Sequence, residues 1–241
     1  MDADSPVPLF VCVLKTGGSY GLQDVRALQA SIRRFNPHAT LCCLTDAQDA
    51  ESADGIEVMR LEHDLPGWFS KLEVFRIRSR PFIYVDLDVV FTSRVKVRIP
   101  EGLWILRGFK GSGVNSSVLM VNGDFSDILE RFLQARDDNV RKYSSSGDFW
   151  GDQDVIRDSG LITGYIQDIA PTLAGSWKNT LRYAMGTVRH APAILVFHGQ
   201  PKPSEMSIRV LDEGVVRIFC GRYLPHALYH AVRDRLRGVR R

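Results

Sequence analysis

The sequence predicts an α/β fold whose Rossmann-like central sheet is mostly parallel and flanked by helices. In the first third of the chain, apolar runs at residues 8–14 and 39–44 flank residues 22–35, whose apolar side chains recur at helical spacing. A strand, a helix and a second strand in this order place the two strands parallel. Residues 82–91 form a further run that is apolar except for two aspartates, as is typical of a strand buried on both faces.

Apolar periodicity and turn residues predict the remaining elements in chain order. The strands expected are 56–59, 103–106, 117–121 and 193–197, followed by a hairpin of residues 206–211 and 215–219. The helices expected are 68–77, 125–135, a short helix opened by the acidic segment 148–156, and an amphipathic helix over 223–240. Residues 171–193 are expected to be irregular. With 241 residues and no repeat or linker, the chain is expected to form a single domain over 1–241.

Two aspartates, Asp86 and Asp88, stand two residues apart at the end of the run at 82–91. Ligands of open α/β sheets collect where strands end, so we expect both carboxylates at the carboxyl edge of the sheet. Adjacent carboxylates repel, and a bound cation keeps both ionised; hard oxygen ligands suit Mg²⁺ or Mn²⁺. A divalent metal that meets a phosphate is the first hypothesis, and a solvated acidic turn is the alternative. Asp46 is expected at the same edge.

A glycine-rich turn at residues 15–21 joins the first strand to the first helix. Its glycines would let the backbone approach a nucleotide closely. The turn lacks the GxGxxG and GxxxxGK[ST] spacings, so the sequence does not support a dinucleotide-binding fold or a P-loop. A flexible connecting loop explains the same residues.

His198 follows the apolar run at 193–197, and Lys202 lies four residues beyond it. An imidazole can complete a carboxylate metal site without adding charge, and a nearby lysine could neutralise the phosphates that the metal bridges. A hydrogen-bonded core histidine is the alternative for His198 taken alone.

The composition is that of an ordinary globular protein, with 44% hydrophobic and 24% charged residues. The formal net charge of +3 does not argue for a nucleic-acid binder. Positive charge gathers near the C-terminus, at Arg233, Arg235, Arg237, Arg240 and Arg241. A solvated helix face explains these arginines, and contact with a polyanion is the alternative.

Cysteine usage and the N-terminus bear on location. The four cysteines show no CxxC spacing and are expected to be reduced: Cys12, Cys42, Cys43 and Cys220. The chain opens with acidic residues rather than a basic signal region, and no apolar stretch approaches the roughly twenty residues of a membrane span. We therefore expect a cytoplasmic protein without a membrane span.

Four sequence blocks carry a family resemblance. They are Phe-Ile-Tyr-Val-Asp-Leu-Asp at 82–88, Asn-Ser-Ser-Val-Leu-Met-Val-Asn at 115–122, Gly-Asp-Gln-Asp at 151–154 and Phe-His-Gly-Gln-Pro-Lys-Pro at 197–203. In this order they resemble the motifs of GT-A glycosyltransferases, and most of all those of glycosyltransferase family 8 and its relatives. The family pattern runs HxxGxxKPW, whereas here the lysine comes two residues earlier and no tryptophan follows. A cousin family of the same fold fits equally.

The resemblance implies a metal-dependent glycosyltransferase that moves a sugar from a nucleoside-diphosphate sugar, with a UDP-sugar as the first candidate, to an acceptor hydroxyl with retention of configuration. It implies Mn²⁺, or Mg²⁺, bound to the donor diphosphate by Asp86, Asp88 and His198. The further donor contacts that it implies are Lys15, Thr16 and Asp46 at the base and ribose, Lys71, Asn115, and Lys202 at the diphosphate. It also divides the chain into a nucleotide-binding half at 8–91, a sugar and acceptor half at 92–203, and a hairpin with a basic helix at 204–241.

Asp152, Gln153 and Asp154 are the candidates for contacting the reacting sugar or the acceptor hydroxyl. By the same resemblance, Asn115, Asp152 and Gln153 are expected to line the sugar pocket. The alternative is that Asp152 caps the N-terminus of a helix whose first turn carries acidic residues, which would explain the same sequence. The acceptor is left open among saccharide, lipid, protein and modified nucleic acid.

Three other functions share parts of this pattern. A haloacid-dehalogenase-like phosphatase also places two aspartates after an apolar strand, but near the start of its domain and usually followed by Gly-Thr, whereas Val89 and Val90 follow here. A nucleotidyltransferase of similar fold would use metal and lysine and release pyrophosphate. A non-catalytic nucleotide-sugar-binding module is the third alternative.

Overall fold

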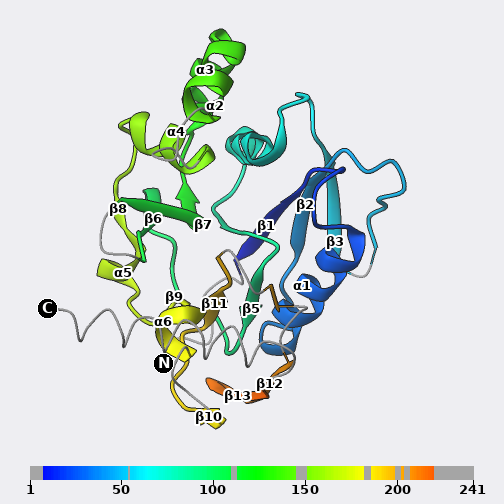
Figure 1. The fold of residues 1–241 in the computed structure, drawn as a ribbon, viewed down its shortest axis with the longest axis vertical. Coiled ribbons are helices and arrows are strands. Elements are labelled where there is room, and N and C mark those ends of the chain that lie inside the picture. The colour runs from blue at the N-terminus through cyan, green and yellow to red at the C-terminus, as the bar shows by residue number, and fades with distance from the viewer. Residues whose placement is uncertain are drawn as a thin grey trace, which may run out of the picture.

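The computed structural model describes residues 8–53, 55–109, 113–144, 151–181, 186–198, 202–203 and 207–219. A seven-stranded central sheet has the order β3-β2-β1-β4-β7-β6-β8. Its strands are β1 (Leu9–Leu14), β2 (Leu41–Thr45), β3 (Ile56–Arg60), β4 (Phe82–Val85), β6 (Gly102–Arg107), β7 (Val114–Asn122) and β8 (Gly164–Tyr165). β1 to β4 run parallel, and β7 is antiparallel to its neighbours β4 and β6. The predicted α/β fold with a mostly parallel sheet is confirmed (Figure 1).

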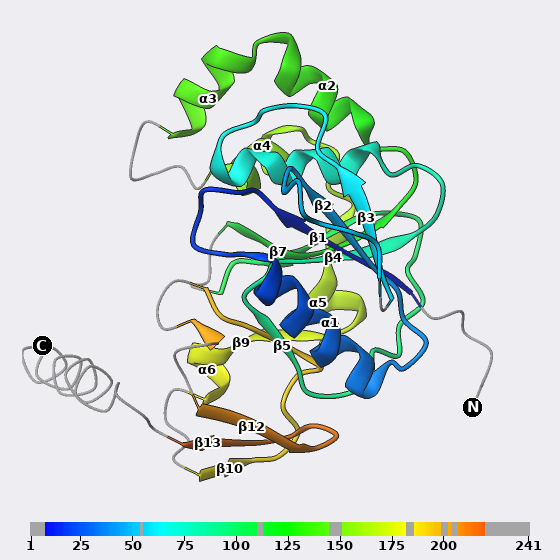
Figure 2. The same cartoon turned by 90° about the vertical axis from the view of Figure 1, so that its right-hand side faces the viewer.

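Two small sheets lie beside the central one (Figure 2). One has the order β5-β11-β9, built from β5 (Val89–Phe91), β11 (Ile194–Val196) and β9 (Ala174–Ser176). The other has the order β10-β13-β12, built from β10 (Gly186–Val188), β13 (Val215–Phe219) and β12 (Ser207–Asp212). β12 and β13 pair antiparallel, so the predicted hairpin is confirmed.

Helices cover both faces of the central sheet (Figure 2). On one face lie the 3₁₀ helix η1 (Gly67–Arg76) and the helices α2 (Ser126–Gln134), α3 (Arg136–Ser144) and α4 (Asp152–Asp158). On the other lie α1 (Leu22–Phe35) and α5 (Ile166–Ile169), with α6 (Trp177–Leu181) near the small sheets.

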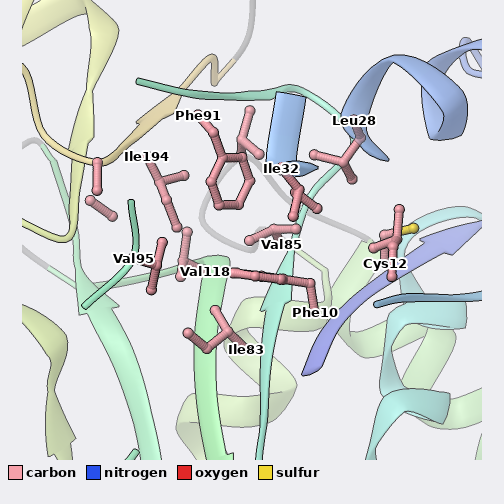
Figure 3. Packing of buried hydrophobic residues seen from close by; sticks show 14 of the residues in the cluster. Phe10, Cys12, Leu28, Ile32, Ile83, Val85, Phe91, Val95, Val118 and Ile194 are labelled. Atoms are coloured by element: carbon pink, nitrogen blue, oxygen red, sulfur yellow. The ribbon is translucent and has the colours of Figure 1, made fainter. Parts of the chain in front are cut away.

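The inner strands bury side chains on both faces. Successive side chains of a strand point to opposite sides, so Phe10 and Cys12 join one apolar cluster while Leu9 and Val11 join the other. Figure 3 shows the first cluster, in which the ring of Phe10 meets that of Phe91 edge-on, 5.2 Å between centroids. These two clusters hold the sheet between its helical layers.

The run at 82–91 is not one strand, and this prediction was wrong in part. β4 ends at Val85, and β5 begins at Val89 in a different sheet, paired with β11. Asp86 still donates its backbone N–H to Ser117 O in the central sheet, at 2.9 Å, whereas Asp88 O accepts the N–H of Phe197 at 2.9 Å. The two aspartates therefore mark the place where the chain changes sheets.

Three further elements differ from the sequence predictions. The segment at 68–77 is helical as expected, but as a 3₁₀ helix. Residues 171–193 are not wholly irregular, because they include β9, α6 and β10. α3 was not predicted, because Tyr143 is its one buried residue and the segment therefore lacks an apolar stripe.

Some predictions fall outside the described residues: the helix at 223–240, its arginines, and Cys220. Cys12, Cys42 and Cys43 are buried free thiols, as expected. Within the described ranges, no helix combines the length and the apolar character needed to cross a bilayer.

Candidate active site

The side chains predicted to be functional gather at the carboxyl ends of the parallel strands. Lys15 and Thr16 follow β1, Asp46 follows β2, and Asp86 follows β4. Parallel strands end at one edge of the sheet, so these residues share that edge. The antiparallel strand β7 begins there, which brings Ser117 to the backbone of Asp86.

Lys71 reaches this edge from η1 and is only 8% exposed. Its Nζ lies 2.9 Å from Asp86 Oδ1 and 2.9 Å from Asp152 Oδ2. It also donates to Ser116 Oγ at 2.9 Å, and that hydroxyl donates to Asp152 Oδ2 at 2.6 Å. One buried ammonium thus joins carboxylates from the end of β4 and the start of α4.

The charges in this cluster depend on one another. Burial alone would lower the pKa of Lys71, but the charges of Asp152 and Asp86 outweigh it and raise that pKa. Burial raises the pKa of Asp152, an effect that the charge of Lys71 opposes. Lys71 is therefore charged at neutral pH and compensates two carboxylates. Without it, negative charge would be buried unpaired.

Sequence reasoning missed two members of the cluster. Tyr84 OH donates to Asp86 Oδ1 at 2.7 Å, and its ring centroid lies 5.2 Å from Lys71 Nζ. Its position two residues before Asp86, on the same face of the strand, was the available signal. Ser116 is the second: Asn115 was predicted instead, but the side-chain oxygen of Asn115 accepts the N–H of Ser117 at 3.1 Å.

Asp88 has a second cation beside it. Its Oδ2 accepts a hydrogen bond from Lys202 Nζ at 2.7 Å and another from Tyr20 OH at 3.1 Å. Burial and the charge of Asp86 raise the pKa of Asp88, while Lys202 opposes that shift. The structure thus brings together Asp88 and Lys202, which are 114 residues apart. Tyr20 was missed, although it lies in the glycine-rich turn that sequence reasoning singled out.

His198 follows β11, which ends at Val196. The residue before it, Phe197, donates its backbone N–H to Asp88 O. The imidazole Nε2 lies 2.7 Å from Ser176 Oγ, and the ring stacks on Phe109 with 5.2 Å between centroids. Phe109 O in turn accepts a hydrogen bond from Asn179.

The donor atoms at this edge fit a divalent cation by their chemistry. Asp86 and Asp88 present carboxylates whose mutual repulsion contributes to the raised pKa of Asp88, and a cation between them would offset that repulsion. Among the described side chains, no three of His, Cys, Asp or Glu approach closely enough to hold a metal ion. Metal binding by Asp86, Asp88 and His198 therefore stays a prediction.

A separate polar group occupies the ends of β1 and β2. Asp46 accepts the backbone N–H of Thr16 at 2.8 Å and its hydroxyl at 3.0 Å. Lys15 Nζ lies 2.8 Å from Asp46 and 2.7 Å from Asp64. Although burial would raise the pKa of Asp46, hydrogen bonds from Lys15 and Thr16 lower it. The structure thus brings Lys15, Thr16 and Asp46 into contact, and their role at the base and ribose stays a prediction.

The three candidates from the acidic segment, Asp152, Gln153 and Asp154, lie at the start of α4 and differ in their contacts. Gly151, not Asp152, is the N-cap, and the Asp152 carboxylate contacts Lys71 and Ser116 instead, so the capping alternative does not hold. Asp154 is 2% exposed and forms an ion pair with Arg157 at 2.5 Å. Gln153, the residue between Asp152 and Asp154 in the sequence, is half-buried. Of the three, Asp152 is the one joined to Lys71.

Comparisons with known proteins show which fold this is. Two structures of the glycosyltransferase GlyE from Streptococcus pneumoniae TIGR4, one in the apo form, are similar to 81% of this chain, with TM-scores of 0.52 and 0.55 at 16% identity. The chain has the fold of a glycosyltransferase. No family model matches it.

A sequence similarity points the same way. Over 79 residues, 30% of this chain, it is 35% identical to beta-1,4 N-acetylgalactosaminyltransferase 1 of Rattus norvegicus. That stretch covers 14% of the rat protein, and the match to GlyE covers 55% of the GlyE chain. The chain thus spans about half the length of the GlyE chains and a smaller share of the rat enzyme.

Replacing Lys71 by Met should lower the free energy of unfolding by about 3–5 kcal/mol, because Asp86 and Asp152 would lose their buried counter-charge. Urea titration at neutral pH measures the change. Lys96→Met, at an exposed lysine, is the control and should stay within about 0.5 kcal/mol of the parent. Equal stabilities for the two variants would contradict the assignment.

Asp46→Asn should destabilise the protein at pH 7 but not in acid. The pKa of Asp46 is lowered in the folded state, so its stabilisation is present above the ordinary carboxyl pKa of 3.8 and disappears as pH falls through the lower folded value. The difference in melting temperature between parent and variant should therefore shrink below about pH 4. The exposed Asp49→Asn variant should track the parent at every pH. A pH-independent difference would refute the role given to the charge.

Proposed function

We propose that this chain is a GT-A type, metal-dependent glycosyltransferase that moves a sugar from a nucleoside-diphosphate sugar to an acceptor hydroxyl. The observation that carries the proposal is the pair Asp86 and Asp88 at the carboxyl edge, each contacted by a lysine, Lys71 for Asp86 and Lys202 for Asp88. The likeness to GlyE supports it through the fold. A UDP-sugar is the first candidate donor, by resemblance.

The diphosphate is the part of the donor that this edge suits best. Breaking the bond to the anomeric carbon leaves negative charge on the β-phosphate, and positive charge placed there lowers the barrier. Lys202 supplies one such charge, 2.7 Å from Asp88. Mn²⁺ or Mg²⁺ held by Asp86, Asp88 and His198 would supply the larger share of charge neutralisation when bound.

The base and ribose would lie over the ends of β1 and β2. Asp46 is fixed there by Thr16 and Lys15, so its carboxylate has a defined orientation before any ligand binds. Preorganised acceptors and donors cost less to order on binding. This arrangement supports a nucleotide-binding half at 8–91.

The donor sugar would lie between the diphosphate and the start of α4. There, Asp152 and Lys71 present a carboxylate and an ammonium 2.9 Å apart, which suit sugar hydroxyls as acceptor and donor. Asn115, Gln153 and Asp154 stay candidates for this region. By resemblance the reaction retains configuration, and the oxygens near the reacting sugar stabilise its oxocarbenium-like character.

The sugar and acceptor half is proposed to be 92–203, and 204–241 a C-terminal hairpin with a basic helix. Saccharide, lipid, protein and modified nucleic acid are the acceptor classes open by resemblance, and the C-terminal arginines would suit an anionic one.

A panel of sugar nucleotides with and without Mn²⁺ tests the proposal, scored by thermal stabilisation and by release of nucleoside diphosphate. The expected result is a metal-dependent shift with one donor and slow hydrolysis to its nucleoside diphosphate. Release of pyrophosphate from nucleoside triphosphates would indicate a nucleotidyltransferase, and phosphate release from phosphate esters a phosphatase. Metal-dependent binding of a sugar nucleotide, with no reaction product whichever acceptor is added, would indicate a binding module.

Asp88→Asn should abolish metal-dependent nucleotide binding and leave the fold intact. The change removes a carboxylate whose ionisation the folded protein disfavours, so the melting temperature should not fall by more than a few degrees. Calorimetric titration of UDP with Mn²⁺ measures the binding. Asp127→Asn, at an exposed carboxylate on α2, is the matched control. Undiminished Mn²⁺-dependent affinity in the Asp88 variant would remove Asp88 from the metal site.

A further inference from the structure

Trp68 is the most exposed of the large hydrophobic side chains in the described ranges. It is 71% exposed, against 43% for Leu211 and 40% for Ile169. Single exposed apolar residues are ordinary on protein surfaces, so exposure alone says little. The position of Trp68 is what makes it informative.

Trp68 stands on the same face of η1 as Lys71. Side chains three residues apart eclipse each other in a 3₁₀ helix, so Trp68 lies one turn before Lys71 along that face. Lys71 points into the site, where it contacts Asp86 and Asp152. The indole therefore lies at the rim of the candidate active site.

The start of α4 lies against the indole. Gly151 adopts φ +66°, and a Cβ at this residue would come within 2.9 Å of Trp68 Cε3. The ring thus packs against the backbone immediately before Asp152. The rest of the indole is exposed to solvent, so a ligand can stack on its open face.

We propose that Trp68 is the platform on which a sugar ring of the acceptor packs, so that the acceptor is a carbohydrate; this rests on the proposed function. An indole face is electronegative and attracts the partly positive C–H bonds on the apolar face of a pyranose. The donor diphosphate belongs with Lys202, and the base and ribose with Lys15 and Asp46, whereas Trp68 borders Asp152, where the donor sugar would be received.

The surroundings favour a sugar over the other acceptor classes. A lipid chain would need a continuous apolar patch of a few hundred Å², and one indole does not provide it. Single-stranded nucleic acid would need a cationic groove beside the aromatic ring, but the lysine on the same helix, Lys71, is already paired with two carboxylates.

The test is equilibrium binding of a panel of methyl hexosides and lactose, without donor. Saturation-transfer NMR and tryptophan fluorescence measure the binding. We expect at least one sugar to bind the parent protein, and Trp68→Ala to weaken it about tenfold, which corresponds to about 1.4 kcal/mol. Trp68→Phe should restore most of the affinity, because it keeps an aromatic face. Leu211→Ala, at another exposed apolar residue, should bind as the parent does.

Three results would overturn the proposal. The first is that no sugar of the panel binds the parent, and the second is that Trp68→Ala binds as tightly as the parent. The third is that Trp68→Ala loses affinity for UDP with Mn²⁺ as strongly as for the sugar, which would place the ring at the donor. A failure of the proposed function shows separately, as no metal-dependent hydrolysis of any sugar nucleotide by the parent protein.

Discussion

The buried ion cluster around Lys71 is the interaction on which the rest of the candidate site depends. Asp86 ends β4, Asp152 begins α4, and the ammonium of Lys71 is within 2.9 Å of both carboxylates. Two carboxylates this close, largely removed from water, are costly unless a cation compensates them. A 3₁₀ helix carries that cation, and Ser116 and Tyr84 each donate a further hydrogen bond to one of the carboxylates. The cluster therefore ties the sheet, η1 and α4 into one rigid edge.

The change of sheet at Asp86 to Asp88 decides what else this edge can do. Asp86 remains in the central sheet, while Asp88 turns toward β11 and so toward His198 and Lys202. One short turn thus presents two carboxylates to two different cations. In the function that we propose, these side chains would bind a metal and the donor diphosphate, and the start of α4, with Trp68 beside it, would receive sugars.

The fold was predicted well from the sequence because the spacing of the apolar residues matches the side chains that the structure buries. Strands buried on both faces read as apolar runs, and the aspartates that interrupt such a run stood out for that reason. The break between β4 and β5 was not predicted, because an apolar run does not reveal a change of partner strand. α3 was missed because one buried tyrosine gives no periodicity.

The site was predicted only in part, because its contacts join distant segments. Asp86, Asp88, Lys71 and Asp152 were named, but Tyr20 and Ser116 enter through contacts across 68 and 45 residues that no local pattern encodes. The sequence analysis named Asn115 as a site residue, whereas the structure places its neighbour Ser116 in the Lys71 cluster. Only the register of β7 decides which of the two side chains reaches the cluster. The assignment of His198 and the aspartates to a metal stays a prediction, as do the roles of the other named residues.

A double-mutant cycle on Lys71 and Asp152 tests the central claim most directly. If Lys71 is the counter-charge of Asp152, adding Asp152→Asn to Lys71→Met should recover more than about 1 kcal/mol of the unfolding free energy that Lys71→Met loses, because the unpaired carboxylate is then gone. If the losses from the two substitutions instead add to within about 0.5 kcal/mol, the residues are independent and the account of the cluster is wrong.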